Sequence, residues 1–277
     1  MTYPKGYKPL PVREQTKILC EYFGIDVPSM LPFKNIKVHP ESDGLYVIPK
    51  PSFVAKHLRV RPQDPYKNWG RLTEDGPLAA LESQGNFKNW RKGEMTNKYI
   101  KLLDSTKKAL QQLEEDQEGD FLVISAQTGK KHTGKSVQDV RNSLNDGKEW
   151  LLPAYCVGWM LFTNPHRLTA WEDLAIDCAG DEYSYGADDE FGYCLYFNWY
   201  EDEVHVDGSW VEYARESFGS ASAFGSPLES CNLDIEGTRS DIGDNKQNEL
   251  RNLLDKVYRK GYDKCIEDIK EFLENHE

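Results

Sequence analysis

Residues 120–141, DFLVISAQTGKKHTGKSVQDVR, place a glycine- and lysine-rich segment between a predicted strand and a predicted helix. Gly129, Gly134, Lys135 and Ser136 occupy every fixed position of the G-x-x-x-x-G-K-[ST] phosphate-loop pattern. In such a loop, backbone N–H groups and the helix N-terminus bind phosphates, the lysine contacts the terminal phosphates, and the hydroxyl binds Mg²⁺. The pattern predicts a nucleotide-binding protein or NTPase. Mg²⁺, bound with the nucleotide, is expected as a cofactor only under this hypothesis.

Three features of the same segment weigh against that interpretation. Residues 126–128 separate the predicted strand from Gly129, whereas a phosphate loop normally begins at the strand end. Two lysines and a histidine fill positions 130–132, where small residues usually let the backbone approach phosphate. The predicted helix is also short, so a basic surface loop with glycine turns is the alternative.

A second candidate chemistry is metal-dependent hydrolysis by a hydrolase or nuclease. Asp177 follows an apolar run, and Asp181 and Glu182 come shortly after it. Carboxylate oxygens are the ligands that Mg²⁺ and Mn²⁺ prefer, and a metal held this way can activate water. Asp177 would also be the Mg²⁺-binding acid of the phosphate-loop hypothesis. The candidates for a general base are His166 and His205.

The charge of the chain is unevenly distributed. The net charge is −12, yet residues 1–92 carry 15 Lys and Arg against 9 Asp and Glu, and residues 93–150 carry 9 against 10. Residues 151–277 carry 10 basic side chains against 27 acidic ones. Clustered like charges repel one another, and a basic partner or a cation relieves the repulsion. The distribution therefore favours a partner with a basic surface.

Within the acidic half, residues 178–203 interleave carboxylates with aromatic rings. Rings supply contact area at interfaces, and carboxylates steer a basic partner. We therefore predict a non-enzymatic protein that binds another macromolecule, most directly a protein, through this surface, as an inhibitor or decoy does. The alternative is a hairpin whose rings alternate into the core. The predicted contact residues are Asp188, Asp189, Glu190, Tyr193, Tyr196, Trp199, Glu201, Asp202 and Glu203.

Other partners follow from the same charge pattern. The basic N-terminal region of one copy could dock on the acidic half of another, so a homo-oligomer is an alternative, whereas the overall acidity disfavours nucleic acid.

No apolar run reaches the roughly 18–20 residues of a membrane span, and the N-terminus lacks the apolar core of a signal peptide. Six scattered cysteines without C-x-x-C predict buried thiols in a cytoplasmic protein.

The pattern of helices and strands predicts an α+β fold, with a mixed or antiparallel sheet, flanking helices and a long C-terminal amphipathic helical region. The expected regions are 1–92, rich in Pro, Gly and basic residues, 93–228, a central α+β domain, and 229–277, a helical region. Helices are expected at 12–23, 96–114, 136–145, 245–275 and after a Thr169–Glu172 capping box. Strands are expected at 44–50, 121–125, 174–177 and 191–213, the last turning at Glu201–Asp202. Residues 50–71 are expected to be extended and basic, and residues 218–227 to form a small-residue loop. Residues 150–162 are almost all apolar, so the spacing of their apolar side chains does not distinguish a buried helix from a buried strand.

Overall fold

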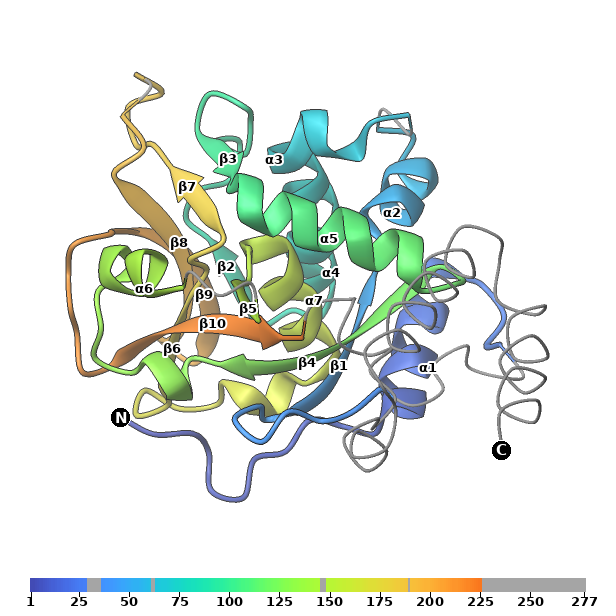
Figure 1. The fold of residues 1–277 in the computed structure, drawn as a ribbon, viewed down its shortest axis with the longest axis horizontal. Coiled ribbons are helices and arrows are strands. Elements are labelled where there is room, and N and C mark those ends of the chain that lie inside the picture. Colours follow the sequence, from blue (N-terminus) through green and yellow to red (C-terminus); the bar gives the residue numbers. More distant parts are fainter. Residues whose placement is uncertain (29–35, 61–62, 145–147, 189, 226–277) are drawn as a thin grey trace, which may run out of the picture. The chain divides into compact units, whose positions relative to one another are not determined.

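The computed structural model describes residues 1–225 apart from 29–35, 61–62, 145–147 and 189 (Figure 1). The predicted C-terminal helical region and the predicted boundary at 228/229 lie outside the described residues. Among the described helices, none combines the length and the apolar character needed to cross a bilayer.

Seven α-helices and ten strands make up the described chain. The helices are α1 (Val12–Phe23), α2 (Pro51–His57), α3 (Trp69–Thr73), α4 (Ala79–Ser83), α5 (Asp104–Asp116), α6 (Val137–Ser143) and α7 (Ala154–Thr163). The strands are β1 (Gly44–Pro49), β2 (Phe87–Asn89), β3 (Ile100–Leu102), β4 (Phe121–Thr128), β5 (Glu149–Leu151), β6 (Ala175–Asp177), β7 (Asp181–Tyr183), β8 (Tyr193–Tyr200), β9 (Glu203–Trp210) and β10 (Phe218–Phe224). Short helical turns η1 (Pro65–Asn68), η2 (Glu74–Leu78), η3 (Lys130–His132) and η4 (Pro165–Arg167) connect them.

The strands form one mixed sheet in the order β1-β4-β10-β6-β8-β7-β3, with β5 beside β10 and β9 between β8 and β2. The pairs β10–β6 and β2–β9 are parallel, and the other pairs are antiparallel. This arrangement confirms the predicted combination of helices with a mixed sheet. Because β1 pairs with β4, a single sheet includes strands from both the predicted N-terminal region and the predicted central domain.

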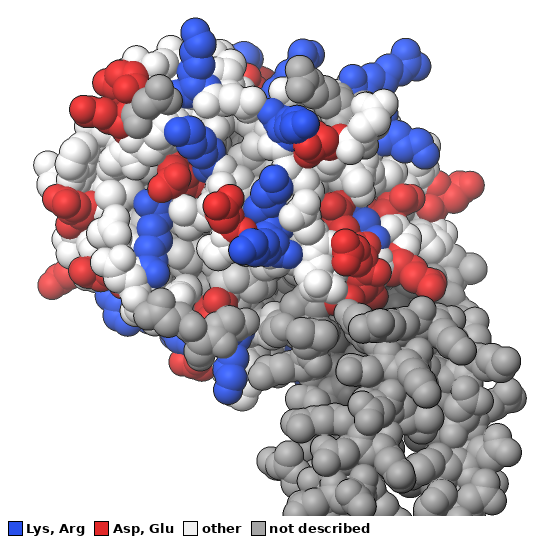
Figure 2. Space-filling view, turned by 45° about the horizontal axis from the view of Figure 1, so that its top comes forward, with Lys and Arg blue, Asp and Glu red and all other residues white. Residues whose placement is uncertain are grey.

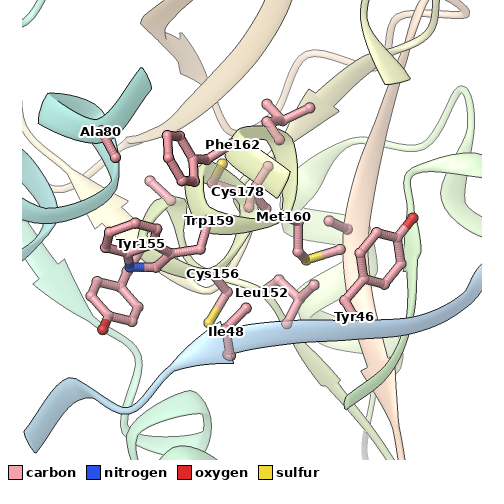
Figure 3. Packing of buried hydrophobic residues seen from close by; sticks show 14 of the residues in the cluster. Tyr46, Ile48, Ala80, Leu152, Tyr155, Cys156, Trp159, Met160, Phe162 and Cys178 are labelled. Carbon is pink, nitrogen blue, oxygen red and sulfur yellow. The ribbon is translucent and has the colours of Figure 1, made fainter. Parts of the chain in front are cut away.

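Helix α7 lies at the centre of the hydrophobic core. All its residues are buried, so it is apolar around its whole circumference and gives no amphipathic pattern. It contacts β1 on one side and η2 and α4 on another. In Figure 3, Trp159 and Tyr155 of α7 lie on the side of Ala80, whereas Met160 points toward Tyr46. Burial on every side explains why periodicity could not assign residues 150–162.

The cysteines in the described part of the chain are buried free thiols, as predicted: Cys20, Cys156, Cys178 and Cys194. Burial raises the pKa of each of these thiols. A thiol with a raised pKa is a weak nucleophile, so these side chains pack as small apolar groups.

Strand β10 overturns the prediction of a small-residue loop at 218–227. It lies inside the sheet, with β4 on one side and β6 and β5 on the other (Figure 1). A Cβ atom added at Gly219 would lie 2.1 Å from the carbonyl oxygen of Gly129. The small residues of β10 therefore allow the backbones to approach closely, which the composition alone does not distinguish from a loop.

Two other predictions in the first half of the chain were wrong. Residues 50–71 are helical in large part rather than extended, because Pro51 occupies the first turn of α2, where its missing N–H costs nothing. The helix expected at 96–114 begins at Asp104, because Ile100 pairs with Tyr183 in the sheet. In the first case a local helix-start signal was overlooked, and in the second sheet pairing outweighs the local helical pattern.

The predicted capping box at Thr169 does not start a helix. The carboxylate of Asp173 accepts hydrogen bonds from the backbone N–H of Thr169, at 2.7 Å, and of Ala170, at 2.9 Å. These bonds close a local turn in place of a first helical turn.

Asp181 is a buried carboxylate that joins three elements. Its Oδ1 accepts a hydrogen bond from the indole of Trp69 in α3 at 2.8 Å, and its Oδ2 accepts one from the N–H of Ala154, the first residue of α7, at 2.6 Å. A carboxylate at a helix N-terminus satisfies a free N–H group and interacts favourably with the helix dipole. Burial raises the pKa of Asp181 to about 7, and the two hydrogen bonds and Arg141 limit that rise.

We expect Asp181→Ala to lower the free energy of unfolding by about 3 kcal/mol at mildly acidic pH, because a buried donor left without its acceptor costs about 1–3 kcal/mol. Urea titration followed by circular dichroism measures the change. Glu182→Ala on the same strand is the matched control, since that side chain is only partly buried, and it should cost less than about 1 kcal/mol. Equal losses in the two variants would contradict the proposed role of Asp181.

Candidate binding site

The predicted phosphate loop lies between β4 and α6, but its N–H groups already donate hydrogen bonds inside the protein. The N–H groups of residues 129 and 131 donate to the side chain of Gln127, and that of residue 130 donates to the hydroxyl of Tyr3. The N–H groups of residues 132, 133, 134 and 135 donate to the backbone carbonyls of Gly129, Lys130, Phe218 and His132, respectively. A phosphate cradle needs such donors to point outward together. In this conformation the loop uses them to attach η3 to β10 and to the N-terminal segment.

Ser136, the predicted Mg²⁺ ligand of this loop, is the N-cap of α6. Its hydroxyl donates to the carboxylate of Asp139 at 2.7 Å and accepts from the N–H of Asp139 at 3.0 Å. Strand β4, which precedes the loop, is antiparallel to both of its neighbours, β1 and β10. The nucleotide hypothesis, which also involves Gly129, Gly134 and Lys135, therefore stays a prediction without supporting geometry.

This geometry predicts that millimolar ATP or GTP with Mg²⁺ leaves the melting temperature of the protein unchanged. A ligand that binds only the native state raises stability by mass action, so thermal-shift measurement detects binding directly. Lys135→Ala is the matched variant. A nucleotide-dependent rise that disappears in Lys135→Ala would reinstate the phosphate-loop hypothesis.

The three predicted metal ligands lie in different surroundings. Asp181 is engaged by Trp69 and Ala154, and Glu182, the next residue of β7, points to the opposite face of the sheet. Asp177 lies on β6, two strands away in the sheet. Within the described ranges, no group of three His, Cys, Asp or Glu side chains could hold a metal ion. The candidate bases are also engaged, since an imidazole nitrogen of His166 lies 3.0 Å from the carbonyl of Lys8 and His205 contacts Trp90 and Glu203.

Asp177 is buried between two polar neighbours of the sheet, Ser220 on β10 and Tyr196 on β8. Burial raises the pKa of Asp177 to about 7, and the positive charge of Arg215 offsets part of the rise. The hydroxyl oxygen of Ser220 is itself buried and has no hydrogen-bond partner among the described residues. The folded state therefore favours the protonated form of Asp177.

The raised pKa of Asp177 predicts that stability falls as pH rises from 3.8 to about 7, because the unfolded chain releases the proton that the folded state retains. Asp177→Asn should therefore be more stable than the wild type by up to about 4 kcal/mol at mildly alkaline pH, since the pKa rises by about three units and each unit corresponds to about 1.4 kcal/mol. At about pH 4 the two proteins should be equally stable. Urea unfolding across this pH range measures the difference, and an equal gain at both ends would show that the effect does not come from the proton.

The predicted acidic surface is divided by the length of strand β8. Asp188 and Glu190 precede β8, Glu201 and Asp202 follow it, and Asp189 lies outside the described residues. An eight-residue strand extends about 23 Å, because each residue advances about 3.3 Å. The predicted acidic contact residues therefore form two groups, one before β8 and one after it. Figure 2 shows acidic and basic side chains interspersed over the described part of one face.

In the group before β8, Asp188 is engaged within the protein, whereas Glu190 is exposed. The carboxylate of Asp188 accepts hydrogen bonds from the hydroxyl of Ser184 at 2.9 Å and from the N–H of Glu190 at 3.2 Å, which lower its pKa. Tyr193 packs against the hydrophobic core, whereas Tyr196, on the opposite face of β8, contacts the ring of Phe218. These two tyrosines do not share a surface.

Near the same end of the sheet, the N-terminal region contributes a cation to the acidic half. The guanidinium of Arg91 lies 2.8 Å from the carboxylate of Asp207 and stacks on the ring of Tyr185, 4.7 Å from its centroid. Among the described residues this is the one ion pair between residues 1–92 and residues 151–225. Ion pairing between the basic region and the acidic half of the same chain is thus limited to one contact among the described residues, and the docking of one copy on another stays a prediction.

The group after β8 stays exposed at the turn of the β8–β9 hairpin. Glu201 and Asp202 are exposed and make no ion pair within the part of the chain that the structure describes. Glu203 is partly buried, and its carboxylate lies 3.1 Å from Nε2 of His205. Uncompensated negative charge therefore remains at the turn.

Exposed aromatic rings adjoin this turn. The exposed fractions are 56% for Trp171, 50% for Trp90 and 42% for Tyr200. Ring centroids lie 5.7 Å apart for Trp171 and Tyr200, 5.4 Å for Tyr200 and His205, and 5.9 Å for His205 and Trp90. The indole N–H of Trp90 donates to Nδ1 of His205 at 3.0 Å, and Nε2 of His205 lies 3.1 Å from the carboxylate of Glu203.

A groove of about 440 Å³ opens beside the same hairpin. Trp199 and Val204, which pair across β8 and β9, line it from the hairpin, and the segment at 165–169 lines it from the end of α7. The remaining lining residues are Leu81, Gln84, Asn86 and Leu161. We call the groove, the aromatic residues Trp90, Trp171 and Tyr200, and the acidic residues Glu201, Asp202 and Glu203 the hairpin-tip surface.

Sequence reasoning found four members of the hairpin-tip surface, Trp199, Glu201, Asp202 and Glu203, and missed the others. Trp90 belongs to the loop after β2, and Trp171 to a short turn after η4. Neither lies in the acidic aromatic segment, and the sheet pairing of β2 with β9 brings Trp90 to the hairpin. An isolated tryptophan in a polar segment is the only signal the sequence offers for these rings.

The hairpin turn is formed by two residues in the left-handed region. Glu201 has φ of 49° and Asp202 has φ of 64°, and Tyr200 pairs with Glu203 across the turn. A two-residue turn with positive φ at both positions favours Asn-Gly, because side chains other than Asn and Asp are strained there. The protein keeps two carboxylates where a less strained turn is available.

We expect the double substitution Glu201→Asn, Asp202→Gly to raise the free energy of unfolding by about 1 kcal/mol, because it relieves the left-handed strain and the repulsion between adjacent carboxylates. Thermal and urea unfolding at neutral pH measure the change. The matched control is Glu212→Asn, at an exposed position without positive φ, which should be neutral within about 0.5 kcal/mol. A destabilised double variant would contradict the assignment of strain.

No protein-family model matches the chain, and no curated protein or solved structure is significantly similar to it.

Proposed function

We propose that this chain is a non-enzymatic protein that binds another protein, with the hairpin-tip surface as its contact site. The observation that carries the proposal is the combination of three exposed aromatic rings with unpaired carboxylates at one turn. Folded monomers rarely expose contiguous apolar patches that have no binding role, and Trp and Tyr are enriched among the residues that dominate binding energy.

The groove does not share a face with the ring of Tyr200, because Trp199 lines it and consecutive residues of a strand point to opposite faces. The proposal therefore depends on the aromatic and acidic residues of the hairpin-tip surface. Interfaces commonly surround aromatic anchor side chains with a polar rim. The phosphate-loop and metal hypotheses have no comparable geometry among the described residues.

Alanine substitution at the rings tests the proposal. Trp171→Ala and Tyr200→Ala should each reduce the recovery of bound proteins, in quantitative affinity capture and cross-linking, at least tenfold, because a ring that anchors an interface contributes about 2 kcal/mol or more. The matched control is Tyr213→Ala, since Tyr213 is 61% exposed and lies beyond the end of β9. All three variants should keep the wild-type melting temperature within about 2 °C, because exposed substitutions rarely affect stability. Equal recovery with all variants would overturn the proposal.

A further inference from the structure

We infer that the hairpin-tip surface binds an arginine side chain of another protein and selects arginine over lysine. The site is the face of the hairpin that carries the rings of Trp171 and Tyr200. The groove, which Trp199 lines from the opposite face of β8, takes no part. This inference rests on the proposed function and specifies the chemistry of the partner.

Rings and carboxylates lie together on this face. Tyr200 pairs directly with Glu203 across the turn, so their side chains point to the same side of the hairpin, and the ring of Trp171 lies 5.7 Å from that of Tyr200. Glu201 and Asp202, which form the turn, are exposed and make no ion pair with a described residue. The face therefore combines aromatic surface with uncompensated negative charge, and a cation is its complement.

An arginine of the chain itself shows how such a face holds a cation. Arg91 lies 2.8 Å from the carboxylate of Asp207 and 4.7 Å from the centroid of the Tyr185 ring. Asp207 comes four residues after Glu203 on β9, so both carboxylates lie on the same face of that strand. The hairpin tip offers the same two kinds of group, and no described residue supplies the arginine.

Two other exposed rings of the described chain already have a cation of their own. Lys88 lies 5.3 Å from the centroid of Trp90, and Arg215 lies 5.4 Å from that of Tyr213. No described cation lies over either ring of the inferred site. These two rings therefore keep exposed surface for a cation that comes from outside the described chain.

The combination of a ring with carboxylates favours a guanidinium over an ammonium group. A guanidinium is planar, so its face stacks on a ring while its edge donates to carboxylates. Arg91 makes both contacts at once. Lys88 lies over Trp90 without an ion pair to a described carboxylate, because an ammonium is a compact, strongly hydrated charge that does not present a face and an edge.

NMR titration of the full-length protein with capped amino acids tests the inference. The probes are the N-acetyl amides of arginine, lysine and citrulline, the last of which has the shape of arginine without its charge. At millimolar concentration and low ionic strength, the arginine probe should shift the indole N–H signal of Trp171 at least threefold more than the lysine probe, and citrulline should leave it in place. The indole signal of Trp90, whose ring Lys88 already covers, is the internal control and should not move.

Charge removal on the protein provides the matched comparison. Glu201→Gln, Asp202→Asn should reduce the arginine-induced shift of Trp171 at least threefold. Glu190→Gln, Glu216→Gln removes the same charge at exposed positions outside the hairpin-tip surface and should leave the shift unchanged. Equal reduction by both pairs would reduce the effect to net charge and overturn the inference.

Four other outcomes would also overturn it: equal shifts with arginine and lysine, an equal shift with citrulline, no shift of Trp171 with any probe, or a dimer of this chain that the Glu201→Gln, Asp202→Asn pair abolishes. If any of these occurred while protein capture still depended on Trp171 and Tyr200, the binding function would stand and the partner chemistry would be wrong. If capture were also equal in all variants, both would be wrong.

Discussion

The buried carboxylate of Asp181 is the contact on which the arrangement of the core depends. It fixes the N-terminus of α7, the helix at the centre of the core, and the indole of Trp69 in α3 to strand β7. Arg141 of α6 donates to the backbone carbonyls of Ala179 and Asp181, so a fourth element attaches at the same point. Burial of a carboxylate is unfavourable unless its oxygens accept hydrogen bonds, and here the donors come from two helices, α3 and α7, that also contribute to the core.

The parts of the fold that the sequence predicts are those in which local pattern and tertiary burial agree. The helix at 12–23, the strand at 44–50 and the hairpin turn at Glu201–Asp202 all have a clear period or turn signal, and the structure confirms them. Strand β10 was missed because its small residues serve the close approach of Gly219 to Gly129. That requirement depends on a segment about ninety residues away in the chain, and no local pattern records it.

The acidic half of the chain shows why a charge count alone does not locate a surface. Asp173, Asp177 and Asp181 are buried, and Asp173 and Asp181 accept hydrogen bonds from backbone or indole N–H groups. Asp207 pairs with Arg91. The partners of Asp181 and Asp207 come from distant elements, so the sequence gives no sign of these contacts. What remains exposed and unpaired at the hairpin is a small part of the predicted acidic face.

The hairpin tip combines three features that oppose stability. Glu201 and Asp202 lie in left-handed backbone and are adjacent like charges, and the side chains of Trp171 and Tyr200 are exposed. Natural proteins retain strained backbone, adjacent like charges and exposed rings where binding requires them. Because all three occur at one turn, a single external ligand could compensate them together. Such a ligand must be basic to relieve the repulsion and partly apolar to cover the rings.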